Sequence, residues 1–106
     1  MNNMNVTDAK IEQEIQAKGL NAPRITPDHI NNTIKDIEFL RPKCGVLTIC
    51  VLTLVNGFTV TGESACASPE NFNEEIGRNI AFENARQKIW ALEGYLLKQR
   101  LYEGKN

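Results

Sequence analysis

The chain has 106 residues, which is the usual length of one domain. Its 12 basic and 13 acidic side chains nearly cancel and form no polybasic run, so duplex nucleic acid is not an expected partner. The longest apolar run, residues 46–55, is too short to cross a bilayer, and residues 1–10 lack the apolar core of a secretory signal. These features predict a soluble protein of the cytoplasm without a membrane partner.

The three cysteines, Cys44, Cys50 and Cys66, are odd in number and show no Cys-x-x-Cys spacing. This pattern argues against a disulfide framework and against a zinc site, and it is typical of thiols in a reducing compartment. The glycines are too scattered to form a phosphate-cradling loop. We therefore expect no metal and no resident cofactor.

The first 24 residues are expected to form an N-terminal unit of their own. Residues 1–6 are predicted to be a polar tail, and residues 8–18 a short helix that Gly19 would end. A helix of this length is marginal in isolation, so it needs a partner surface in its own chain or in a neighbouring subunit. Residues 25–106 are predicted to form a single α+β domain.

That domain is predicted to start with a second short helix. Thr26-Pro27-Asp28 supplies a capping hydroxyl, a proline at the first helical position and an acid in the first turn. Isoleucines recur at helical spacing through Ile37, so the helix is expected to end near Asp36. A short strand over residues 38–41 would follow, before Pro42 forces a break.

The clearest local signal is Asn56-Gly57, which separates two runs that favour strands. Asn-Gly is typical of a two-residue type I′ hairpin turn, in which both residues need positive φ. On this basis Gly57 should tolerate substitution less well than Gly62. The first strand is apolar on both faces and is expected to be central and covered on both sides. A two-residue loop pairs Val55 with Phe58, Leu54 with Thr59, Thr53 with Val60 and Leu52 with Thr61.

The C-terminal third favours one long helix. Ser68-Pro69-Glu70 repeats the helix-start chemistry, and no proline follows before Tyr102. Such a helix would be about 50 Å long at the usual rise, with Gly94 as the expected bend. Its apolar residues form several bands, which predicts contact with a second subunit. The expected fold is therefore an antiparallel β-hairpin or small sheet packed on a long C-terminal helix, with two short N-terminal helices.

A candidate binding stripe lies on this helix. Arg78, Phe82 and Arg86 stand four residues apart and so share one helix face. Two guanidiniums beside an aromatic ring can hold a nucleotide, because the guanidiniums take phosphate oxygens and the ring stacks on a base. Phe58, directly after the hairpin turn, is a second candidate platform. The alternative is ordinary: the arginines pair with glutamates of their own helix, and the two rings belong to the core.

Catalytic residues are not expected. The single histidine, His29, has no nucleophile or orienting partner fixed beside it by the sequence. The carboxylates of Glu74, Glu75 and Glu83 would chiefly complement the dipole at the helix start rather than serve a hydrolase. The protein is therefore expected to act by binding and not as an enzyme.

Three segments are similar to a family of small tailed-phage proteins described from coliphage N4 gene 49 and Shigella phage Sf6 gene 66. They are "NGFTVTGESAC", "SPENFNEEIGR" and "KIWALEGYLL". The resemblance covers about residues 25–102 and leaves the N-terminal unit outside. It extends to the first type of phage Thoeris anti-defence protein.

That resemblance implies a sponge, a protein that binds a cyclic ADP-ribose immune signal, and in some members cyclic oligonucleotides, without cleaving it. It also implies a homo-oligomer in the cytoplasm of the infected bacterial host. The implied ligand residues that match here are Phe58, Arg78 and Arg86, whereas Phe82 departs from the basic residue common at its position and leaves the ligand open. Two alternatives remain: an inhibitor that remodels a host protein through its helical apolar surface, and a hydrolase of the nucleotide.

Overall fold

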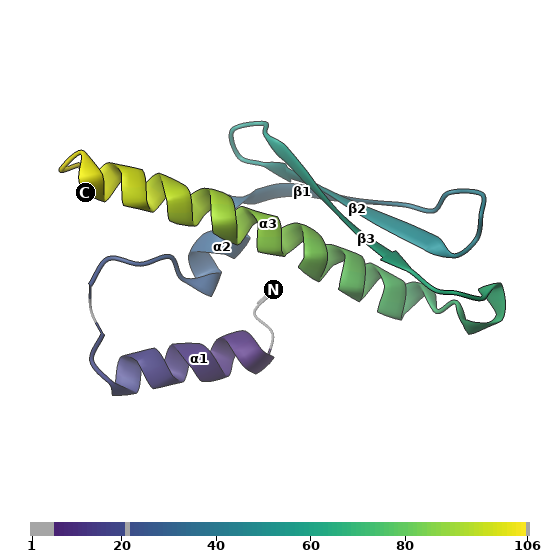
Figure 1. Ribbon diagram of the computed structural model, residues 1–106, viewed down its shortest axis with the longest axis horizontal. Coiled ribbons are helices and arrows are strands. Elements are labelled where there is room, and N and C mark those ends of the chain that lie inside the picture. The colour runs from purple at the N-terminus through teal and green to yellow at the C-terminus, as the bar shows by residue number, and fades with distance from the viewer. Residues whose placement is uncertain (1–5, 21, 106) are drawn as a thin grey trace.

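The computed structural model describes residues 6–20 and 22–105. Of the tail predicted over residues 1–6, residues 1–5 lie outside the described part and Val6 belongs to the first helix. Three helices and a three-stranded antiparallel sheet form an elongated α+β molecule of 51 × 31 × 24 Å (Figure 1). The fold class predicted from the sequence is confirmed. The elements are α1 (Val6–Ala17), α2 (Pro27–Thr33), β1 (Ile34–Leu40), β2 (Leu47–Leu54), β3 (Thr59–Ala65), the 3-10 turn Pro69–Asn71 and α3 (Glu74–Tyr102).

The sheet has the order β1-β2-β3, and α3 packs along one of its faces (Figure 1). Side chains of β2 alternate strictly between buried and half-buried. The central position predicted for this strand is confirmed, but the described residues bury only one of its faces, where two had been expected. The core between sheet and helix contains Ile30, Cys50, Leu52, Leu54, Val60, Ala81, Ala85 and Ile89.

Small residues bring α3 unusually close to the sheet. A Cβ atom at Gly62 would overlap the carbonyl oxygen of Ala81 and the amide nitrogen of Ala85. At the start of the helix, a Cβ at Gly77 would lie 2.9 Å from the hydroxyl oxygen of Thr48. The backbone of the helix thus rests directly on the backbone of β3, and neither glycine has room for a side chain.

The β2–β3 hairpin differs from the sequence prediction by one residue. Leu54 accepts a hydrogen bond from the amide of Gly57 and donates one to the carbonyl of Phe58, which leaves a loop of three residues. Only Gly57 in this loop has positive φ, at 90°, as in a type I turn followed by a bulge. The shift pairs Leu52 with Val60 in place of Thr61. Burial explains it, because this register puts the apolar residues of both strands under α3.

Two helix boundaries also differ from the sequence prediction. Thr26 caps α2 as expected, accepting a hydrogen bond from the amide of His29 at 3.1 Å. The helix ends at Thr33, however, because β-branched residues beyond it pair with β2, as Ile34 does with Leu54. The isoleucine spacing that suggested a helix to Asp36 therefore belongs partly to a strand.

The long helix begins later than predicted. Ser68-Pro69-Glu70 starts only the 3-10 turn, and α3 begins at Glu74. The helix is capped by Asn73, whose side chain accepts a hydrogen bond from the amide of Ile76 at 2.9 Å. It then continues through Gly94 as one helix (Figure 1), so the expected bend does not divide it. None of the described helices has the length and apolarity needed to cross a membrane.

Candidate functional site

The arginine stripe predicted on α3 divides into two different environments. The side chain of Arg78 is 51% exposed and pairs with Glu74 one turn earlier at 2.8 Å. The side chain of Arg86, two turns later, is fully buried. The ion pair of Arg78 is the ordinary arrangement that sequence analysis left open, and about half of this side chain stays exposed.

Two arginines stack on aromatic rings near the start of α3. The guanidinium carbon of Arg78 lies 5.5 Å from the ring centroid of Phe39, and that of Arg41 lies 4.2 Å from the ring centroid of Phe72. We call these four residues the Arg–Phe cluster. Stacking orders each guanidinium while its edge stays available to donate hydrogen bonds, which is the arrangement that suits phosphate oxygens.

The buried Arg86 is held by all three helices. Its Nε donates a hydrogen bond to Asn31 of α2 at 3.0 Å, and its Nη1 lies 2.9 Å from a carboxylate oxygen of Asp8 in α1. Glu83, one turn earlier in α3, is 3.6 Å from the same nitrogen. The glutamate pairing left open by sequence analysis is therefore present, and Asp8 adds a shorter contact that no local pattern indicated.

The two predicted aromatic platforms lie apart. Phe82 is half-buried and packs against the core, whereas Phe58 is 54% exposed in the hairpin loop. Phe58 lies beyond the end of β2 at Leu54. Arg78 instead lies beside Phe39, which pairs with Cys50 in the middle of β2. The chain therefore does not bring the four predicted site residues into one pocket, and a role for each in binding stays a prediction.

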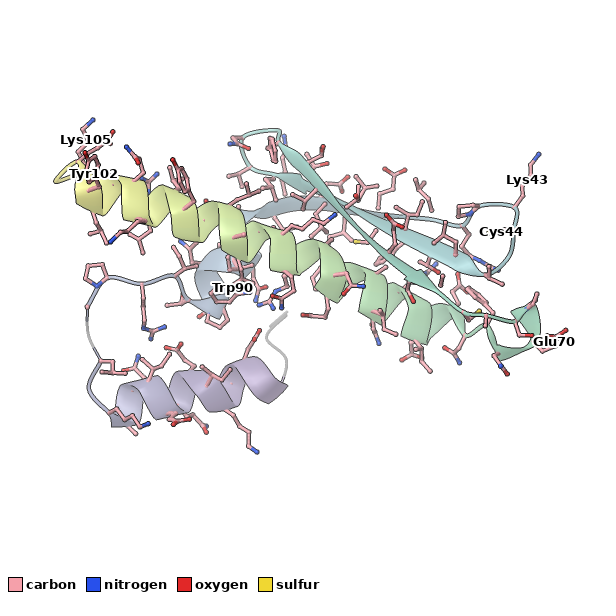
Figure 2. The ribbon with its side chains drawn as sticks, in the orientation of Figure 1. Lys43, Cys44, Glu70, Trp90, Tyr102 and Lys105 are labelled. Carbon is pink, nitrogen blue, oxygen red and sulfur yellow. The ribbon has the colours of Figure 1, made fainter. Side chains whose placement is uncertain are left out.

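A cavity of about 320 Å³ separates α1 from α3, and we call it the α1 cavity. Its walls are mostly apolar, and Figure 2 shows Trp90 on the side of α3 that faces α1. Arg24 lies at its edge and forms a two-pronged ion pair with Glu12 at 2.6 and 2.9 Å. That guanidinium lowers the pKa of Glu12 below its usual range. The lining residues are Asp8, Ile11, Glu12, Ile15, Arg24, Ile25, Pro27, Gln87 and Trp90.

The imidazole of His29 and the thiol of Cys50 are both held within the fold, whereas Cys44 is an exposed thiol. His29 contacts Glu93 across α2 and α3 at 2.8 Å, and Thr33 donates a hydrogen bond to the carbonyl of His29. Burial raises the pKa of the Cys50 thiol to about 11, so it stays protonated at neutral pH. Among residues 6–20 and 22–105, no three His, Cys, Asp or Glu side chains gather as metal ligands would.

Sequence reasoning missed residues of both the Arg–Phe cluster and the α1 cavity. Phe39 and Arg41 lie in a segment expected to be a short strand. The cation that stacks on Phe39 is about 40 residues away in the sequence, and the ring under Arg41 is about 30 residues away. Trp90 was grouped with the apolar bands of α3. The packing of the sheet on α3 places Phe39 beside Arg78, and the position of α1 places Trp90 at the α1 cavity; local spacing encodes neither.

A model of one protein family matches residues 25–101. It is the phage protein family described from N4 Gp49 and phage Sf6 gene 66. The chain belongs to this family. The match covers α2, the sheet and nearly all of α3, and it leaves α1 outside. No curated protein and no solved structure matches the chain.

Proposed function

We propose that this phage protein binds and sequesters a cyclic ADP-ribose-type nucleotide signal in the cytoplasm of the infected host, without cleaving it. The observation that carries the proposal is the Arg–Phe cluster, in which two guanidiniums stack on rings at 4.2 and 5.5 Å. Membership of the phage family and the resemblance to Thoeris anti-defence proteins support the same class of function. The cluster offers cations for a pyrophosphate and aromatic surface for a base.

Binding without turnover suits the chemistry of this cluster. A sponge needs charge-assisted hydrogen bonds and stacking, and it needs neither a nucleophile nor a general base. Arg41 and Arg78 supply the first, and Phe39 and Phe72 the second. A partner subunit would enclose more of the ligand than one chain can, which is why we include a homo-oligomer in the proposal.

Calorimetric titration with cyclic ADP-ribose tests this function. Arg78→Ala and Arg41→Ala should each weaken binding about tenfold to a hundredfold, the range expected for one charge-assisted contact to phosphate. Arg100→Ala, an exposed arginine in the last turn of α3, is the matched control and should bind as the parent does. Failure of the parent to bind would exclude the proposal, and recovery of a cleaved nucleotide after heating would favour a hydrolase.

A second candidate is inhibition of a host protein through the end of α3. Figure 1 shows the last turns of this helix extending past the sheet, and Tyr95 and Tyr102 there are 72% and 83% exposed. Leu92, Leu96 and Leu101 add to this apolar surface, each at least 40% exposed. A surface of this kind favours a protein partner, which on the sponge proposal is a second copy of the chain.

A further inference from the structure

The attachment of α1 differs from that of every other element. Two carboxylate–guanidinium pairs tie this helix to the rest of the chain, Asp8 with Arg86 and Glu12 with Arg24. Asp8 and Glu12 are four residues apart, so they project from one face of the helix. The apolar residues between α1 and Trp90 leave the 320 Å³ of the α1 cavity unfilled.

The buried guanidinium is only partly satisfied in this arrangement. Arg86 is 0% exposed, and its Nη2 has no hydrogen-bond acceptor among the described residues. A guanidinium that is closed off from water normally has acceptors for all its N–H groups. A ligand with more acceptor oxygens than one carboxylate would therefore satisfy Arg86 better than Asp8 does.

We propose that α1 is a strap that opens from this cavity, and that the two arginines it releases, Arg24 and Arg86, bind a diphosphate-containing ligand. The carboxylates of Asp8 and Glu12 then occupy, in the closed state, the positions that two phosphate groups take in the open one. Trp90 supplies a ring beside them for a base. This inference rests on the proposed function only for the class of ligand, because it concerns residues outside the Arg–Phe cluster.

The closed strap lowers the apparent affinity, because only the open fraction of molecules can bind. Removing one of the two ion pairs should raise that fraction. Glu12→Gln is the safer variant, since Arg24 has a side chain that is 26% exposed and can be hydrated when it loses its partner. Asp8→Asn tests the buried pair directly but strands a charge beside α3 and is expected to cost stability.

The experiment uses the full chain and ADP as the probe, with adenosine as the ligand that lacks the diphosphate. Glu12→Gln should bind ADP about threefold to tenfold more tightly than the parent. Glu14→Gln, which removes the same charge from an exposed pair with Lys18 on α1, is the matched control and should leave ADP binding unchanged. Adenosine lacks the diphosphate and should bind more weakly than ADP to all three proteins.

Trp90 reports on the strap without any ligand, because it is the single tryptophan of the chain. Its quenching by acrylamide should increase in Glu12→Gln and stay at the parental level in Glu14→Gln. Equal ADP affinities in all three proteins, absence of ADP binding, or unchanged quenching would each overturn the strap. The sponge function is judged separately, by cyclic ADP-ribose and the Arg78 and Arg41 variants.

Discussion

The two sides of α3 are packed in different ways. Against the sheet, Gly62 lets the helix backbone touch the strand backbone, and the residues between them are fully buried. On the side of α1, one ion pair joins Asp8 to Arg86 of α3 and a second joins Glu12 to Arg24 ahead of α2, around a cavity of about 320 Å³. The family match covers the first interface and stops short of α1. Close backbone packing fixes the position of an element, whereas ion pairs over a cavity allow it to part.

The largest effect is expected from filling the closest contact. Gly62→Ala should destabilise the protein by about 3 kcal/mol or more, because the added methyl meets the backbone of α3, which cannot move aside cheaply. Gly57→Ala is the comparison, since Gly57 has open space around it but a φ of 90°. It should cost about 1–2 kcal/mol. Urea unfolding measures both.

This order is the reverse of the one expected from the sequence, where the turn glycine was the sensitive one. Equal losses in the two variants would mean that α3 adapts to the added methyl, and the contrast between the two sides of the helix would weaken. A larger loss for Gly57→Ala would restore the expectation drawn from the Asn-Gly turn.

The next effect compares one chemical change on both sides of α3. Ile89→Ala removes a fully buried side chain and should cost about 2–5 kcal/mol. Ile15→Ala removes a half-buried side chain that already borders the α1 cavity, so it should cost less than about 1 kcal/mol. Thermal and urea unfolding give both values. Similar losses would show that α1 is as firmly packed as the sheet.

The sequence predicted the elements better than their contacts. Thr26 and Gly57 carry local signals for a cap and a turn, and the elements they bound were found to within a few residues. The predicted hairpin register was wrong because it was set by the Asn-Gly turn alone. The pairing of apolar Leu52 with apolar Val60, which the structure shows, was not weighed against it. The burial of Arg86 was not predicted, because helical spacing shows which face a residue shares but not which other segment covers that face.

The C-terminal end of α3 differs from both of these interfaces, because its side chains are apolar like those of the core but are exposed to solvent. If a second copy of the chain covers it, Tyr95→Glu should weaken self-association at least about tenfold by placing a charge in a buried contact. Tyr95 is 72% exposed within the chain, so thermal stability of the monomer should change little. Lys98→Glu is the control on the same helix. Light scattering that shows a stable parental monomer at micromolar concentration would contradict the oligomer.

The smallest effect concerns the ion pair that holds α1. The hydrogen bond from Arg24 is the main reason that the pKa of Glu12 lies below its ordinary value of 4.5. A carboxyl whose pKa is lowered by folding stabilises the closed state above its unfolded pKa, and this contribution disappears as the pH falls through the folded pKa. Arg24 stays charged throughout, so the loss comes from protonation of Glu12.

Trp90 emission, followed from pH 7 down to about pH 3, makes this loss visible at the α1 cavity. The parent should show a red shift whose midpoint lies below 4.5, the ordinary pKa of Glu12. Glu12→Gln should lack this component and start from the shifted emission at neutral pH, because an amide cannot replace the charge. Any transition that the variant retains arises from groups other than Glu12. Identical curves for the two proteins would show that the Glu12–Arg24 pair does not hold α1 in place.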